Sequence, residues 1–259
     1  MMSTMAVGRA GRRDVRLVLA MLAVTAAAWA LTADRMAAMD AGPTAELGGI
    51  GWFALTWLLM MAAMMLPALT PMVVAYSRRA GSPVARATFA AGYLAAWLAA
   101  GFVAYAAIQT VRAGGLGFLS WHGAGRFVGA GVLAGAGLYR LTSQKRSFLR
   151  RCCERATFVD QRFRPGAPGA LRMGIEHGGD CVGSSWALMA ALFALGVMSL
   201  PWMAFVALLI ATERLLPRTT RAAVAVVFVV LATGVALVPD RVPGLTVPET
   251  TSSWQMHMR

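Results

Sequence analysis

Charged residues are scarce in this chain, and acidic residues are the scarcest. Charged residues make up 14% of its 259 residues, against about 25% in an ordinary soluble domain. Lysine and arginine number 24 and outnumber the 11 aspartates and glutamates, which gives a net charge of +13. With 58% hydrophobic residues, such a composition argues against a soluble domain and indicates an integral membrane protein.

Cysteine is also rare. The three cysteines are Cys152 and Cys153, adjacent in a basic segment, and Cys181. An odd number does not suggest a disulfide framework, and an adjacent pair without further spaced ligands is a weak metal signal. Because all three lie in or near segments predicted to face the cytoplasm, we expect reduced thiols.

Several functional motifs are missing. The sequence has no nucleotide-binding glycine motif, no HExxH and no convincing Ser/His/Asp order. The positive charge does not form a basic domain with interleaved aromatic residues, so nucleic acid is not an expected partner. No complete catalytic set is visible, which predicts a protein that is not an enzyme.

Long hydrophobic runs dominate what is present. A helix crossing a hydrocarbon layer of about 30 Å needs about 20 apolar residues. We therefore predict an all-α, polytopic membrane bundle over residues 17–238 with about seven transmembrane helices, or six if the first is a cleaved signal. The predicted spans are 17–33, 49–72, 87–110, 126–141, 174–200, 201–216 and 222–238.

The arginines predict an orientation. They concentrate in the N-terminal tail, 1–16, and in the longest polar segment, 142–172. The positive-inside rule places both in the cytoplasm. Seven spans then leave the C-terminal tail, 239–259, outside a cytoplasmic (inner) membrane, with lipid as the surrounding partner.

Methionine is concentrated in the second span, WLLMMAAMMLPALTPM at 57–72. On a helix, Met60 lies over Met64 and Met61 over Met65. These two thioether columns suit Cu(I), which prefers soft sulfur donors. Methionine also fills gaps in packed cores without binding a metal, so packing is the alternative interpretation.

Two prolines, Pro67 and Pro71, follow the methionines in the same span. A proline inside a helix lacks the backbone donor and crowds the preceding turn. The sequence therefore predicts that the helix kinks or ends near Met72, about where it leaves the bilayer.

A second group of candidate ligands opens the fifth span in MGIEHGGDCVGSSW. His177 and Cys181 are spaced i,i+4, with Asp180 beside them, so an imidazole, a carboxylate and a thiol share a helix face that could bind a transition metal. Alternatively, His177 and Asp180 lie at headgroup level opposite the arginines. Glu213 is expected to pair with arginines at the surface.

Four segments carry a family resemblance, which covers about residues 50–217. They are AMMLPALTP (63–71), LYRLTSQKRSFLRRC (138–152), the run from Gly169 to Met203 and ERLLP (213–217). Together they resemble the bacterial family of predicted metal-binding integral membrane proteins. Members of that family are described as membrane copper chaperones associated with tyrosinase-type polyphenol oxidases. The resemblance implies a copper-handling membrane protein with a cuproenzyme partner.

The chain departs from that family at cysteine positions. Phe148 stands where the family usually has a cysteine. The family pattern Cys-x-Gly-Cys-Cys-Trp reads Cys-Val-Gly-Ser-Ser-Trp here, so Ser184 and Ser185 replace two thiols. Hydroxyls are poor Cu(I) ligands, so the resemblance shifts the expected site toward the thioethers.

Three hypotheses therefore stand. The leading one is a non-enzymatic membrane copper chaperone that supplies a cuproenzyme. Its Cu(I) ligands would be Met60, Met61, Met64 and Met65, with Cys181, His177 and Asp180 as a possible inner site. The second is a structural or assembly subunit of a membrane complex that binds no metal, its methionines and small residues serving only packing. The third is a subunit of a membrane oxidase.

Overall fold

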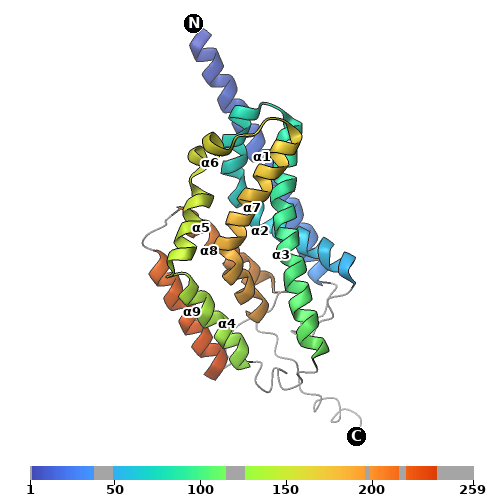
Figure 1. Cartoon of the computed structure of the whole chain (residues 1–259), viewed down its shortest axis with the longest axis vertical. Helices are drawn as coiled ribbons and strands as arrows, with labels where there is room; N and C mark the ends of the chain where they lie inside the picture. The colour runs from blue at the N-terminus through green and yellow to red at the C-terminus, as the bar shows by residue number, and fades with distance from the viewer. Residues whose placement is uncertain (1, 38–48, 115–125, 196–198, 216–219, 238–259) are drawn as a thin grey trace.

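The computed structural model describes residues 2–37, 49–114, 126–195, 199–215 and 220–237. Within these ranges the chain forms nine helices and no strand (Figure 1). This confirms the predicted all-helical class. The predicted outer tail, 239–259, lies outside the described residues.

The helices run α1 (Met2–Ala37), α2 (Ile50–Ala80), α3 (Pro83–Ala113), α4 (Arg126–Tyr139), α5 (Ser143–Cys153), α6 (Arg155–Arg162), α7 (Gly166–Leu195), α8 (Leu200–Leu215) and α9 (Thr220–Leu237). Long helices pack as neighbours in pairs, α1 with α2, α3 with α7 and α4 with α9 (Figure 1). Helix α7 also packs against α4, α5 and α8, and α8 packs against α2. Helix α7 is therefore the element that joins the parts of the bundle.

Helix α2 does not end at its prolines. Pro67 and Pro71 both lie inside the helix, which continues to Ala80. Of the two predicted outcomes, an end of the helix near Met72 is therefore wrong, whereas a kink there stays a prediction. Each proline removes one backbone hydrogen bond, but the turns on either side keep theirs, and unwinding would expose many more polar groups to an apolar surrounding.

The basic segment 142–172 is largely helical rather than an extended polar loop. The side chain of Thr142 caps α5 by accepting from the backbone N–H of Lys145 at 3.3 Å. Lys145, Leu149 and Cys152 are all buried. Their i,i+4,i+7 spacing places them on one face of α5, which packs against α7. The arginines of α5 lie on the rest of its surface. The segment is therefore polar in overall composition although one face of α5 is buried.

Helices α3 and α7 approach closely because glycines face the contact. A Cβ added to Gly174 would collide with the backbone carbonyl of Phe89, and one added to Gly178 would lie 2.6 Å from the Cβ of Ala96. Small residues let two helix backbones approach at a distance that side chains would prevent. This contact fixes the face of α7 that carries His177 and Cys181.

By length and composition, three helical segments among the described residues are able to cross a membrane, namely Gly11–Met36, Ile50–Ala80 and Pro83–Thr110. Two shorter apolar helices, Phe127–Tyr139 and Ala223–Leu237, are also present. The described parts of the seven predicted spans lie mainly on helices, but three helices of membrane length are fewer than the seven predicted, and the number that cross a bilayer stays a prediction.

Candidate metal centre

The face of α7 that turns into the bundle carries a run of buried polar side chains. His177, Cys181, Ser184 and Ser185 are each less than 5% exposed. Their spacing follows the helix repeat, so they lie along one stripe. Buried polar groups need partners. Those of the Cys181 side chain come from α3 and α8, whereas the Ser184 hydroxyl donates to the carbonyl of Cys181 within α7.

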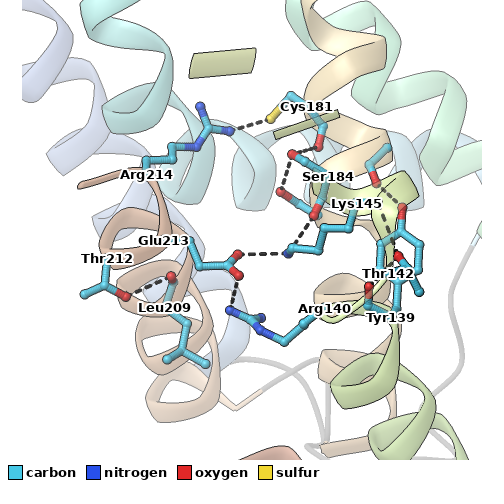
Figure 2. A network of polar contacts seen from close by, with 12 residues as sticks. Tyr139, Arg140, Thr142, Lys145, Cys181, Ser184, Leu209, Thr212, Glu213 and Arg214 are labelled. Atoms are coloured by element: carbon cyan, nitrogen blue, oxygen red, sulfur yellow. Dashed lines mark hydrogen bonds and ion pairs between the residues drawn. The ribbon is translucent and has the colours of Figure 1, made fainter. Parts of the chain in front are cut away.

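The sulfur of Cys181 is the centre of several polar contacts. The guanidinium of Arg214, from the end of α8, donates to it at 2.8 Å (Figure 2). The hydroxyl of Tyr93, from α3, lies 3.0 Å from the same sulfur. Cys152, from α5, lines the same cavity as Arg214. Neither Cys152 nor Cys181 takes part in a disulfide within the described structure.

These contacts suit a thiolate at Cys181. A guanidinium only donates and stays charged, so the sulfur beside Arg214 must accept. A thiolate can also accept from the hydroxyl of Tyr93. The neighbouring Cys181, together with burial, raises the pKa of the Cys152 thiol well above its ordinary value.

Arg214 connects Cys181 to the methionine-rich helix. Its second terminal nitrogen donates to the backbone carbonyl of Ala68 in α2 at 3.3 Å. Ala68 lies between Met64 and Met72 on one face of that helix. The guanidinium therefore bridges α2 and α7, and Figure 2 shows its side chain directed at Cys181.

A cavity of about 410 Å³ lies between α2 and α8, beside Arg214. Its sulfur-bearing lining residues are Met64, Met72, Cys152 and Cys153. The rest of the lining is mainly apolar, with Trp29, Pro67 and Leu208 among it. The bundle thus brings two thioethers and two thiols to the wall of one apolar cavity.

The structure places the four predicted methionines in different surroundings. Met60, Met61, Met64 and Met65 are all buried. Met64 lines the cavity, where it is joined by Met72, whereas Met60, Met61 and Met65 are absent from the lining. The cavity face repeats at Met64, Ala68 and Met72 because it follows the i,i+4,i+8 row of the helix. The two predicted columns therefore do not both face one space.

His177 and Asp180 have surroundings that differ from those of Cys181, although Tyr93 touches both His177 and Cys181. The imidazole is buried among the rings of Phe89, Tyr93 and Phe158, with centroid distances of 6.2, 5.8 and 5.3 Å. Neither ring nitrogen has a hydrogen-bond partner in the described part of the chain. The carboxylate of Asp180 faces Arg151 of α5 at 3.6 Å.

A buried ion cluster lies next to the metal candidates. The carboxylate of Glu213 pairs with Lys145 at 2.9 Å through one oxygen and with Arg140 through the other (Figure 2). The Lys145 ammonium also donates to the carbonyl of Ser184 at 2.9 Å. All three ionic side chains are at most 4% exposed. Burial lowers the pKa of Lys145, and the Glu213 carboxylate opposes this.

The prediction that Glu213 pairs with arginines at the surface is half wrong. It does pair with an arginine, but the pair is in the interior, because α5 and the end of α4 cover it. Sequence reasoning missed Arg140, Lys145 and Arg214 as interior groups. The available signal was an acidic and a basic residue, Glu213 and Arg214, at the end of an apolar helix, where charge is costly and tends to be functional.

Within the described residues, no group of three or more His, Cys, Asp and Glu side chains is placed to hold a metal ion. The sulfur-bearing side chains that line the cavity are of the soft kind that Cu(I) prefers.

A family model described as PpoB2, copper chaperone, matches residues 54–237. This chain belongs to the PpoB2 copper chaperone family. The match includes α2 from its second turn to α9, and so contains the cavity, Cys152, Cys181 and Arg214. No curated protein and no solved structure matches the chain.

Membership supports a copper-handling role in general. A chaperone binds and passes on its metal instead of converting a substrate, so the family agrees with a protein that is not an enzyme. The sulfur-lined cavity agrees with copper as the metal. The predicted resemblance to a copper chaperone family is confirmed.

Proposed function

We propose that this protein is a multi-pass membrane copper chaperone that holds Cu(I) in the cavity between α2 and α8. The observation that carries the proposal is the cavity lining, where Met64, Met72, Cys152 and Cys153 meet in an apolar surrounding. Neutral thioethers lose little hydration on burial, and they bind Cu(I) without a change of protonation. An apolar pocket with soft donors therefore suits reversible binding and transfer.

The topology is part of the same proposal. Seven spans across a bacterial inner membrane, with the N-terminus inside, place the basic end of α2 at the cytoplasmic face. Met72 precedes Arg78 by about 9 Å along the helix. The cavity then lies in the cytoplasmic half of the membrane, where Cys152 and Cys153 stay reduced. The receiving partner is a cuproenzyme.

Copper binding is tested on the full chain purified in detergent, by anaerobic titration against a chromogenic Cu(I) chelator. We expect the wild-type protein to compete for Cu(I). Met64→Leu/Met72→Leu should weaken binding by about tenfold or more, equivalent to about 1.4 kcal/mol. Leucine keeps the volume and removes the sulfur.

The matched control is Met61→Leu/Met65→Leu, because these two methionines are fully buried outside the cavity lining. We expect its Cu(I) affinity to equal that of the wild type. A wild-type protein that takes up no Cu(I) would overturn the proposal. If such a protein copurified with another membrane protein instead, it would support the metal-free assembly subunit.

A further inference from the structure

We propose that a groove between α1 and α2 binds a phospholipid whose headgroup carries both a phosphate and a primary ammonium, the phosphatidylethanolamine class. The phosphate contacts Arg78, the ammonium contacts Asp14, and one acyl chain lies along the apolar wall of the groove. The groove lies in the membrane by the topology proposed above, but lipid binding there does not depend on copper.

The groove is formed where α1 and α2 lie side by side (Figure 1). Its volume is about 720 Å³ and it is open along one side. This volume is within the range of about 300–1,000 Å³ that small-molecule sites have. The lining is mainly apolar, with Val18 and Leu22 from α1 and Pro67, Pro71 and Val74 from α2 among it. Such a wall suits a hydrocarbon chain.

The α1 wall of the groove follows the helix repeat and ends in a charged residue. Asp14, Val18 and Leu22 are spaced i,i+4,i+8, so they share one face of α1. Asp14 pairs with Arg78, which lines the groove from α2. The ion pair is therefore at one end of the groove, and the apolar residues continue from it along both helices.

The groove has the length of one membrane leaflet. From Pro67 to Arg78 the helix rises about 16 Å, and half of a hydrocarbon layer of about 30 Å is about 15 Å. In the proposed orientation the basic end of α2 faces the cytoplasm, so the groove runs from the headgroup level to the middle of the bilayer. A transmembrane helix of a partner would need a face about twice as long, whereas an acyl chain of one leaflet fits.

The charged end of the groove presents one group of each sign. Nε and Nη2 of Arg78 donate to Oδ2 of Asp14 at 3.2 and 2.9 Å. The pair does not use Nη1 of the guanidinium or Oδ1 of the carboxylate. The side chains of Arg78 and Asp14 are 69% and 21% exposed, so a headgroup can reach both. An exposed ion pair of this kind adds little to stability by itself.

These two groups match a headgroup with one phosphate and one ammonium. A guanidinium donates to phosphate oxygens, and an ammonium donates to a carboxylate. A choline headgroup has no N–H to donate, and phosphatidylglycerol has no cation to place beside Asp14. The Thr70 hydroxyl, in the groove wall, already donates to the carbonyl of Leu66 at 2.8 Å. The ion pair is therefore what selects the headgroup.

The groove and the copper cavity have lining residues in common, namely Pro67, Pro71 and Cys153. Both prolines are exposed in the protein alone, and an acyl chain in the groove covers them. The lipid therefore packs against residues that also form the wall of the cavity. We expect it to stabilise that wall from the groove side.

Native mass spectrometry of the metal-free full chain in detergent tests the site. Phosphatidylethanolamine, phosphatidylglycerol and phosphatidylcholine with identical acyl chains are added separately at equal concentration. We expect one phosphatidylethanolamine to be retained per chain. Its affinity should exceed that of the other two by about tenfold or more, because each of them lacks one charge-assisted contact.

Three variants test the charged end of the groove. Arg78→Gln should weaken retention of phosphatidylethanolamine by about tenfold, since the phosphate loses its cation. Asp14→Asn should remove the preference for phosphatidylethanolamine over phosphatidylglycerol. The matched control is Arg172→Gln, because Arg172 is also in an exposed ion pair, is 67% exposed and does not line the groove. It should retain the lipid like the wild type.

A fourth variant tests the apolar wall without changing charge. Ala75 lines the groove between Pro71 and Arg78, and Ala75→Phe fills part of the space that the acyl chain occupies. It should lower retention of phosphatidylethanolamine by about tenfold, whereas headgroup binding that needs no groove would be unaffected.

The comparison of the three lipids on the wild type needs no variant and decides the outcome. Equal retention would indicate contact with bulk lipid only, and tightest retention of phosphatidylglycerol would indicate a general attraction of arginines to anionic lipid. Either result overturns the proposal, as does a second copy of the chain bound in place of lipid. A wild type that selects phosphatidylethanolamine but takes up no Cu(I) overturns the copper site alone. One that binds Cu(I) without lipid preference overturns the lipid site alone.

Discussion

Two neighbouring regions of the bundle interior differ in charge: one is neutral and the other is ionic. The wall supplied by α2 is neutral and made of thioethers and small apolar groups, with Met64, Ala68 and Met72 on its cavity face. The junction of α5, α7 and α8 is ionic, with Arg140, Lys145 and Glu213 in one cluster and Arg214 beside Cys181. The cavity and its thiols lie where the two meet.

The difference shows how a membrane-type core can tolerate charge. A buried thioether is uncharged and needs no partner of opposite charge. Single substitutions in the α2 wall should therefore be tolerated. Buried ions are stable only as complete sets, because removing one partner leaves an uncompensated charge. The ionic junction should therefore be fragile toward single substitutions, and the methionine wall should be tolerant.

The largest effect is expected at the ionic junction. Glu213→Gln removes the only negative charge that an ion pair in the described structure gives to Arg140 and Lys145. It should destabilise the fold by about 3–5 kcal/mol. Thermal unfolding in detergent measures this. The exposed pair Arg79–Asp160, 2.6 Å apart, gives the control, and Asp160→Asn should cost about 0–1 kcal/mol. Equal losses would contradict a buried, interdependent cluster.

An intermediate effect is expected where α7 meets α3. Gly174→Ala places a Cβ against the backbone carbonyl of Phe89, so the two helices must separate. We expect a loss of about 1–3 kcal/mol of unfolding free energy, the usual cost of overpacking. Gly179→Ala is the control, because a Cβ there meets nothing within 4 Å. If the two variants have the same unfolding free energy, the close contact of α3 with α7 is not what positions the ionic junction of α5, α7 and α8.

The smallest effect is expected in the methionine wall. Met64→Leu/Met72→Leu conserves side-chain volume, so each substitution should cost less than about 1.5 kcal/mol. Thermal unfolding, measured without copper, should match the wild type closely. A large loss would show that the thioether wall is as interdependent as the ionic junction, and the comparison between the two regions would then fail.

The sequence predicted the helical class, and the structure shows that its seven candidate ligands are buried, six of them at most 3% exposed and Asp180 7% exposed. Apolar runs of membrane length and the 3.6-residue repeat are local signals, so they were readable in α2 and α7. What it could not identify was the contact of Arg214 with Cys181 or the pairing of Lys145 with Glu213. Those contacts join helices distant in the chain, and composition marked the segment 142–172 only as basic.

By itself, then, the sequence determined that this protein is an apolar helical bundle with buried methionines and with His177 and Cys181 on one helix face. The tertiary structure alone decided that Met64 and not Met61 or Met65 lines a cavity, that Cys152 lines the same cavity, and that Arg214 donates to Cys181. The physical reason is that hydrophobic periodicity specifies which face of a helix is buried, whereas the partner of each buried polar group is set by how the helices pack.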